Sequence, residues 1–356
     1  MVKNPNINVG LHLVRGLCAL GVAGYHYLSW NHGYAVESVG AFYVYIFFIV
    51  SAVAMMIAHG ADFDRTINLP ALRLFYIKRI ARILPLLALV AFGSAIGGSL
   101  EAGSWQIDTF AKAYLTATAL FGLQMPGMNS GAVAAWSLGI EAVFYLIFPI
   151  AALLTAGARL RTLILAIAIL LVGQHAALWL LRAQDGAEFW FNYTNPLMFA
   201  PYFAVGLALF KAPLRHSAVN FWLTLAILAC IASVSVLSPV NVYRNPSLYL
   251  GLTALSGALV MTAYASRVPE ALRATATFFG DISYALYLTH WFSQRLSSYV
   301  VASLGLPGYL QFPLFLGLAI SVAYVLHIGL ELPAKKAILS WSKGRHISAA
   351  AGEQAS

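Results

Sequence analysis

Long apolar runs, separated by short polar segments, follow one another along almost the whole chain. A helix needs about 20 mostly apolar residues to cross a bilayer, and a run of that length predicts such a helix. The runs place helices near residues 10–30, 39–58, 82–100, 131–156, 161–181, 194–211, 218–237, 246–266, 280–302 and 310–330. We therefore predict an all-α fold, a polytopic membrane bundle of about ten transmembrane helices.

Residues 109–124 are moderately apolar as well, but this segment is short. If it crossed the bilayer, every later loop would change sides, and the bias of basic residues described below would reverse downstream. We therefore expect a re-entrant or interfacial helix within the longest external loop.

The composition fits a membrane protein. Of the 356 residues, 61% are hydrophobic and 9% are charged, whereas about a quarter of the residues in a soluble domain are charged. An ordinary cytosolic enzyme is excluded. Cys18 and Cys230 lie in apolar runs and show neither a disulfide framework nor a metal-site spacing. We expect one membrane domain over residues 8–335 and a short cytoplasmic tail over residues 336–356.

Lysine and arginine are distributed unevenly between the two sides of the predicted bundle. Placing the N-terminus in the cytoplasm leaves Lys112, Arg182 and Arg244 outside, and Arg15 and Arg295 within helices. The other 16 of the 21 basic residues then lie in cytoplasmic segments: Lys3, Arg65, Arg73, Lys78, Arg79, Arg82, Arg159, Arg161, Lys211, Arg215, Arg267, Arg273, Lys335, Lys336, Lys343 and Arg345. Because cytoplasmic loops are enriched in these residues, both termini are predicted to be cytoplasmic, and the net charge of +9 requires no nucleic-acid partner.

Ionisable residues inside the apolar runs are candidates for function, because a charge at membrane depth is costly. Arg15 and His26 are 11 residues apart in the first run, which puts them on nearly the same helix face, about 16 Å apart. That face could hold an anionic group at its cytoplasmic end and a reacting atom deeper in the bundle. The structural alternative is that Arg15 extends to the cytoplasmic surface and His26 bonds a neighbouring helix.

A cluster of cations, Lys78, Arg79 and Arg82, lies at the start of the third predicted helix. Arg79 and Arg82 are three residues apart and share a helix face, and paired guanidinium groups suit phosphates. Anchoring at the cytoplasmic surface would account for the same residues without a ligand.

Two further groups lie in later helices. Glu141 is near mid-depth, and Ser137 and Tyr145, four residues to either side, share its face. Its carboxylate could orient a histidine, act as a base, bind a sugar hydroxyl, or pair with an Arg or His of another helix. His290 is also near mid-depth, and the aromatic residues around it, Tyr287 among them, could form the wall of a sugar or lipid site or ordinary packing.

The other histidines and the search for known catalytic motifs do not indicate a further functional site. His32 and His59, at helix ends, and His216 and His346, in charged segments, are interpreted as surface residues. The sequence contains no zinc-protease, P-loop or serine-hydrolase motif. We therefore expect no metal.

Together, these groups resemble the acyltransferase-3 family of integral membrane acyltransferases. The residues that carry the resemblance are Arg15 to His26, Arg79 to Arg82, Trp136 to Tyr145 and Ser283 to Trp291, followed by Glu331-Leu332-Pro333. The resemblance covers roughly residues 8 to 335. Two positions depart from the family pattern: His12 stands where an acidic residue is usual, and Ser51-Ala52-Val53 where Ser-Gly-Phe is usual.

The resemblance implies transfer of an acyl group, usually acetyl, from cytoplasmic acyl-CoA to a hydroxyl of an extracytoplasmic or lipid-linked glycan, such as an exopolysaccharide or O-antigen. His26 would act as general base toward the acceptor hydroxyl or would carry the acyl group transiently, and Glu141 would orient it, balance its charge or bind the acceptor. The residues implied to bind acetyl-CoA are Arg15, Lys78, Arg79 and Arg82. Those implied to contact the acceptor are Trp136, Ser137, Tyr145, Tyr287 and His290. The location would be a bacterial inner membrane, in contact with membrane lipid.

A transporter or flippase for a lipid-linked or small polar solute is the alternative from another class, since many transporters carry charges near the bilayer midplane. The sequence shows no internal symmetry of the kind that such proteins often have. A purely structural or sensory membrane protein would leave the Arg, His and Glu at membrane depth without a reason.

Overall fold

The structure is a computed structural model of the chain. It describes residues 8–34, 36–237 and 241–353, and the side chains of these residues except at 37, 235–237 and 343–353. Lys3 and the side chains of Lys343, Arg345 and His346, which entered the interpretation of the sequence, lie outside the described part.

Helices make up nearly all of the described chain, which confirms the all-α prediction. The helices are α1 (Val9–His32), α2 (Glu37–His59), α3 (Leu69–Ala102), α4 (Ile107–Ala117), α5 (Pro126–Asn129), α6 (Trp136–Gly157), α7 (Leu160–Leu181), α8 (Gly186–Tyr193), α9 (Ala200–Lys211), α10 (Ala218–Leu237), α11 (Pro246–Tyr264), α12 (Glu270–Ser303), α13 (Gln311–Leu326) and α14 (Leu332–Glu353). Each predicted run overlaps one of these helices. The segment 109–124 holds most of the short α4 and the single turn η2 (Leu120–Leu123).

Among the described residues, six helical stretches are long and apolar enough to cross a membrane by length and composition. They are Ser38–Phe63, Leu69–Ala102, Trp136–Gly157, Leu160–Leu181, Pro246–Tyr264 and Gly308–Ser342. Pro196–Lys211 and Ala218–Val234 are apolar but shorter. Ten crossings, cytoplasmic termini and the domain boundary after residue 335 stay predictions.

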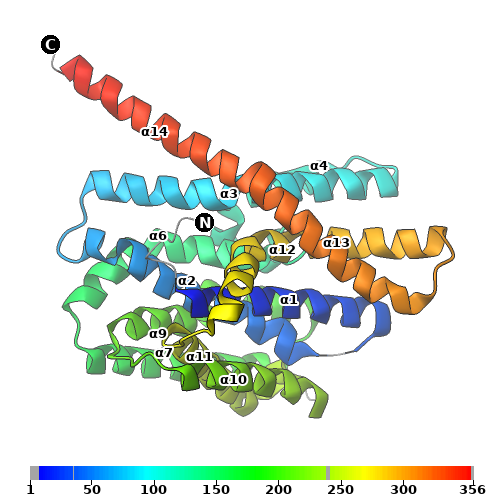
Figure 1. Ribbon diagram of the computed structural model, residues 1–356, viewed down its shortest axis with the longest axis horizontal. Helices are drawn as coiled ribbons and strands as arrows, with labels where there is room; N and C mark the ends of the chain where they lie inside the picture. Colours follow the sequence, from blue (N-terminus) through cyan, green and yellow to red (C-terminus); the bar gives the residue numbers. More distant parts are fainter. Residues whose placement is uncertain (1–7, 35, 238–240, 354–356) are drawn as a thin grey trace.

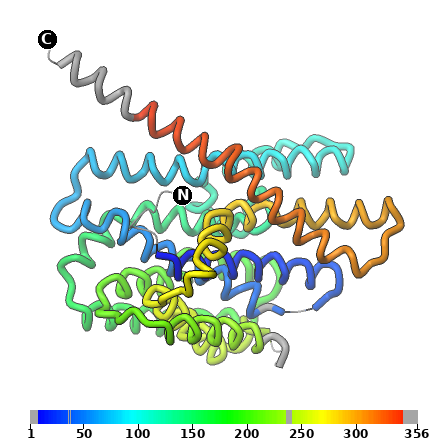
Figure 2. Tube along the Cα trace, in the orientation of Figure 1, coloured from blue at the N-terminus to red at the C-terminus, as the bar shows by residue number. Residues whose placement is uncertain are grey.

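Most of the long helices lie side by side in one bundle, and α14 leaves it at the upper left (Figure 1). Within the bundle α1 packs along α2 and α12, and α12 also packs along α13; the trace of α1 runs through the middle of the view (Figure 2). α1 begins after Asn8, whose side chain accepts a hydrogen bond of 3.0 Å from the Leu11 amide, and ends at Gly33, which has a φ of +68°. Both are ordinary helix-capping arrangements.

The close approach of α1 and α12 depends on two glycines. A Cβ atom on Gly16 would lie 2.5 Å from the Cβ of Phe279, and one on Gly280 would lie 2.5 Å from the Cβ of His12. Small residues let helix backbones approach closely. This contact brings both Arg15 and His26 of α1 close to the α12 motif.

Candidate active site

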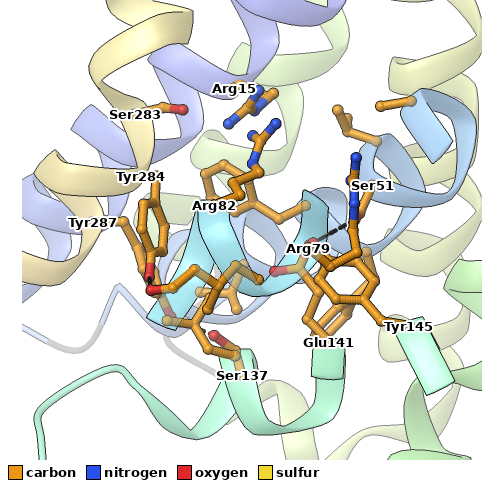
Figure 3. Close-up of a pocket in the computed structure, with 17 residues that line it drawn as sticks. Arg15, Ser51, Arg79, Arg82, Ser137, Glu141, Tyr145, Ser283, Tyr284 and Tyr287 are labelled. Carbon is orange, nitrogen blue, oxygen red and sulfur yellow. Dashed lines mark hydrogen bonds between the residues drawn. The ribbon is translucent and has the colours of Figure 1, made fainter. Parts of the chain in front are cut away.

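A cavity of about 70 Å³ lies among α1, α2, α3, α6 and α12. Its charged lining consists of Arg15, Arg79, Arg82 and Glu141, and the guanidinium group of Arg82 points toward that of Arg15 (Figure 3). Hydroxyl groups complete its polar lining: Ser51, Ser137, Tyr145, Ser283, Tyr284 and Tyr287. We call this space the arginine cavity. It brings together parts of all four sequence groups.

Glu141 is held in the arginine cavity by two hydroxyl groups. Its Oε1 accepts hydrogen bonds of 2.5 Å from Ser51 Oγ and 2.5 Å from the Tyr145 hydroxyl. Tyr145 is on the face of α6 that the spacing predicts. Ser51 is the serine that this chain keeps in its altered second-helix motif, and its contact with Glu141 was not predicted from the sequence.

In the described part of the chain, the three arginines of the cavity are not ion-paired with a carboxylate. Among the described residues, no carboxylate oxygen lies within 4.0 Å of a guanidinium nitrogen of Arg15, Arg79 or Arg82. Nε of Arg79 is buried and has no hydrogen-bond partner in the described part of the chain. Arg15 and Arg79 are partly buried, whereas Arg82 is exposed. Because partly buried cations are costly without a counter-ion, the cavity is suited to an anionic ligand.

His59 contacts Arg79 at the end of α2. Its Nε2 is 3.5 Å from Nη2 of Arg79, at the outer limit of a hydrogen bond, while its Nδ1 is 2.8 Å from Oδ2 of Asp62. Since the carboxylate accepts the proton of Nδ1, Nε2 is left as an acceptor facing the guanidinium. The surface interpretation of His59 was wrong: the residue is 3% exposed and packs edge-on against Phe75, with ring centroids 5.2 Å apart. The spacing His59-x-x-Asp62 was the sequence signal for this pair.

His26 and His290 form a hydrogen-bonded pair. Nδ1 of His290 is 2.8 Å from the backbone carbonyl oxygen of Tyr287, and its Nε2 is 2.8 Å from Nδ1 of His26. A carbonyl only accepts, so Nδ1 of His290 carries a proton and Nε2 of the neutral ring accepts one from Nδ1 of His26. The bonding pattern therefore leaves Nε2 of His26 with its lone pair. Trp30 stacks on the His26 ring at 4.4 Å.

Tyr287 connects this histidine pair to the arginine cavity. Neither His26 nor His290 is among the described residues that line the cavity, but the Tyr287 side chain is. The Tyr287 hydroxyl donates to the carbonyl oxygen of Ala134 at 2.8 Å and lies 2.8 Å from Ser137 Oγ. We call these three residues, Ala134, Ser137 and Tyr287, the Tyr287 latch.

Comparison with known proteins supports the same assignment as the motifs. Residues 8–328 match the family model of an acyltransferase domain. The chain belongs to the acyltransferase-3 family. Neither a curated protein nor a solved structure matches it. Family membership and the six apolar helical stretches together identify a multi-pass membrane protein of an acyltransferase family.

In this acyltransferase-3 protein, the structure shows the surroundings of His12, the first departure from the family pattern, and of the late Glu331-Leu332-Pro333. His12 Nδ1 is 3.4 Å from Oδ1 of Asp281, so a carboxylate from α12 lies beside the position where an acidic residue is usual. The late Glu331-Leu332-Pro333 begins at the end of a π-helical segment, His327–Glu331. There Nδ1 of His327 is 3.0 Å from Oε2 of Glu331, and the segment contacts α3 and α12, which line the cavity.

Besides His290, two residues that the sequence predicts to bind a substrate of the acyltransferase-3 site, Lys78 and Trp136, lie outside the arginine cavity. Lys78 precedes Arg79 on α3 but does not line the cavity. Trp136 lines a second hollow with Trp291, and the remaining lining residues of that hollow are Ser94, Gly127, Ser130, Gly131, Ala132 and Val133. We call the second hollow the tryptophan groove.

Proposed function

We propose that the protein transfers an acyl group, acetyl by preference, from acyl-CoA to a hydroxyl of an extracytoplasmic or lipid-linked glycan such as an exopolysaccharide or O-antigen. In this proposal the protein lies in the inner membrane of a bacterium, and acyl-CoA enters from the cytoplasm. Membership of the acyltransferase-3 family supports the reaction class. The donor and the acceptor are argued from the site.

The observation that supports acyl-CoA as the donor is the convergence of Arg15, Arg79 and Arg82, from two helices, without a carboxylate partner among the described residues. Acyl-CoA is rich in phosphate, and a guanidinium group binds phosphate through paired, charge-assisted hydrogen bonds. A bound phosphate would supply the negative charge that these side chains lack. Glu141 accepts hydrogen bonds from the neutral hydroxyls of Ser51 and Tyr145. It therefore does not prevent the guanidinium groups from binding a phosphate.

The histidine pair supports a general-base step. Nε2 of His26 takes the proton of the acceptor hydroxyl, and the acceptor oxygen forms a bond to the thioester carbonyl carbon. The carbon–sulfur bond breaks, and the departing CoA sulfur takes the proton from His26. His290 holds the His26 ring in the tautomer that this step needs, in the way that a buried partner orients a catalytic histidine elsewhere. General-base catalysis contributes about 10²- to 10⁴-fold to a rate.

The test uses the purified full chain in lipid nanodiscs, with labelled acetyl-CoA and a glycan extract from cells that lack the gene. His26→Ala is expected to lower kcat by about 100-fold or more, while the Kd for acetyl-CoA, measured by calorimetry, changes little. Arg79→Ala combined with Arg82→Ala is expected to raise that Kd instead. His32→Ala, at the end of the same helix, is the matched control.

The outcomes separate the parts of the proposal. Full transfer by the His26 variant would refute the general-base role. An unchanged Kd in the double arginine variant would leave these residues as structural anchors. A wild-type protein that binds no acetyl-CoA would overturn the donor assignment.

A further inference from the structure

The arginine cavity and the tryptophan groove lie along the same three helices. On α3, Ser94 of the groove follows Arg82 of the cavity by 12 residues, which is about 18 Å along the axis. On α12, Trp291 follows Tyr287 by four residues, or about 6 Å. α6 begins at Trp136, and Glu141 of the cavity comes later in the same helix. The two hollows therefore lie at successive levels of one part of the bundle.

The Tyr287 latch lies where these two levels meet. Ala134 and Ser137 flank Trp136 in sequence, and Tyr287 lies one helical turn before Trp291. His290 adjoins Trp291 in the chain and is bonded to the Tyr287 carbonyl. The histidine pair therefore lies beside the boundary between the cavity and the groove, which is where a donor and an acceptor would have to meet.

The floor of the tryptophan groove is built from a tightly fixed backbone. The amide of Gly131 donates to Thr116 Oγ1 at 2.8 Å, and Ser130 Oγ donates to the Ala132 carbonyl at 2.7 Å. A Cβ atom on Gly131 would lie 2.9 Å from the backbone nitrogen of Ala113. Because the floor is held by these bonds and leaves no space for a larger residue at Gly131, the groove is a preformed surface.

The described lining residues of the groove include two tryptophans and two serine hydroxyls, and none of them carries a charge. The nearest charge known to touch it is Arg295, whose Cζ lies 4.9 Å from the centre of the Trp291 ring. That guanidinium is already paired with Glu101, at 2.7 Å. Indole rings with a few hydroxyls suit a ligand that is both flat-sided and rich in hydroxyl groups. An acidic ligand is disfavoured, because the one cation beside Trp291 that the described residues show is already paired with Glu101.

We propose that the tryptophan groove binds the acceptor, and that the part of the acceptor it holds is a neutral sugar stacked on Trp291 and Trp136. This inference rests on the proposed function, since it gives the acceptor its place and charge class. The two substrates are then separated by charge. The anionic donor favours the cationic cavity, and the neutral acceptor favours the uncharged groove.

The experiment measures acetyl transfer from labelled acetyl-CoA to defined tetrasaccharides by the full chain in nanodiscs. Neutral acceptors are the tetramers of β-1,4-glucose, β-1,4-N-acetylglucosamine and α-1,6-mannose, and the acidic acceptor is the tetramer of galacturonic acid. Trp291→Ala is expected to raise the KM for the best neutral acceptor by about tenfold, with the Kd for acetyl-CoA unchanged. Trp291→Phe, which keeps an aromatic face, is expected to recover most of this loss. Trp222→Ala, an exposed tryptophan of α10, is the matched control.

Several results would contradict the proposed acceptor site. An unchanged acceptor KM in Trp291→Ala, equal losses in Trp222→Ala, or a preference for galacturonic acid would overturn the groove assignment. Acetyl-CoA binding without transfer to any neutral tetrasaccharide would also overturn it, while leaving the donor assignment in place. Failure of the wild-type protein to bind acetyl-CoA would instead refute the proposed function itself.

Discussion

The Tyr287 hydroxyl is expected to separate the arginine cavity from the histidine pair. It donates to the Ala134 carbonyl and lies within bonding distance of Ser137 Oγ, both at 2.8 Å. Ala134 has a φ of +63°, a conformation that residues other than glycine rarely adopt. The substitution Tyr287→Phe removes the hydroxyl and keeps the ring that packs against Phe47, with centroids 5.7 Å apart.

The size of the effect follows from these two hydrogen bonds. Each neutral bond contributes about 1 kcal/mol net. Ser137 Oγ already lies 3.3 Å from the Ala134 carbonyl and can strengthen that contact when the phenol is gone. We therefore expect a net loss of about 1 kcal/mol from the closed arrangement, which raises the open fraction roughly fivefold.

The assay is the release of labelled acetate from acetyl-CoA in the absence of an acceptor. An open latch admits water where the acceptor hydroxyl would act, so Tyr287→Phe should raise this hydrolysis about fivefold. Tyr284→Phe is the matched control, because Tyr284 lines the same cavity and its hydroxyl donates to the Ile83 carbonyl at 2.7 Å, outside the latch. Unchanged hydrolysis in Tyr287→Phe, or the same rise in both variants, would refute the reasoning.

Two further substitutions test the lining of the cavity. Asp62→Ala removes the acceptor that fixes the His59 ring under Arg79; it should raise the KM for acetyl-CoA about fivefold with kcat unchanged, whereas the exposed neighbour in Asp64→Ala should change neither. Glu141→Gln removes the only carboxylate among the described lining residues of the cavity. We expect kcat to fall by about tenfold or more, while the KM for acetyl-CoA does not rise because the cavity becomes more positive. An unaltered kcat would show that the carboxylate has only a structural role.

The lengths of the apolar runs located the helices, but charged residues interrupt two of the runs and obscured where α3 and α12 begin. The predicted runs start at residues 82 and 280, whereas α3 begins at Leu69 and α12 at Glu270. In both cases charged residues interrupt the first turns, Arg73, Lys78 and Arg79 in α3 and Glu270 and Arg273 in α12, so these turns do not form an uninterrupted apolar run. α3 could have been extended from the sequence, because Asn68 is a good capping residue and its side chain accepts from the Ala71 amide at 2.9 Å.

That Arg15, Arg79, Arg82 and Glu141 belong to a site could be predicted from the sequence, because each is a charged residue within or beside an apolar run. Contacts between helices could not be anticipated in the same way. The sequence placed His26 about 16 Å from Arg15 along the first helix and His290 near mid-depth, but it did not determine the order of the helices around the bundle, so the pairing of the two histidines was missed. Gly16 and Gly280 are the residues that could have indicated it, since small residues mark places where two helices approach closely.

The pairing of the histidines changes what the carboxylate has to do. A base needs a fixed tautomer, and the sequence offered Glu141 as one group that could fix it. In the structure the Tyr287 carbonyl and His290 supply that constraint, and Glu141 bonds Ser51 and Tyr145 instead. A neutral relay adds no fixed charge beside His26, so its lone pair stays available, while the one carboxylate remains among the arginines. The charged groups and the proton acceptor are thus on different residues. Tyr287 contacts both, because its side chain lines the arginine cavity and its carbonyl oxygen bonds His290.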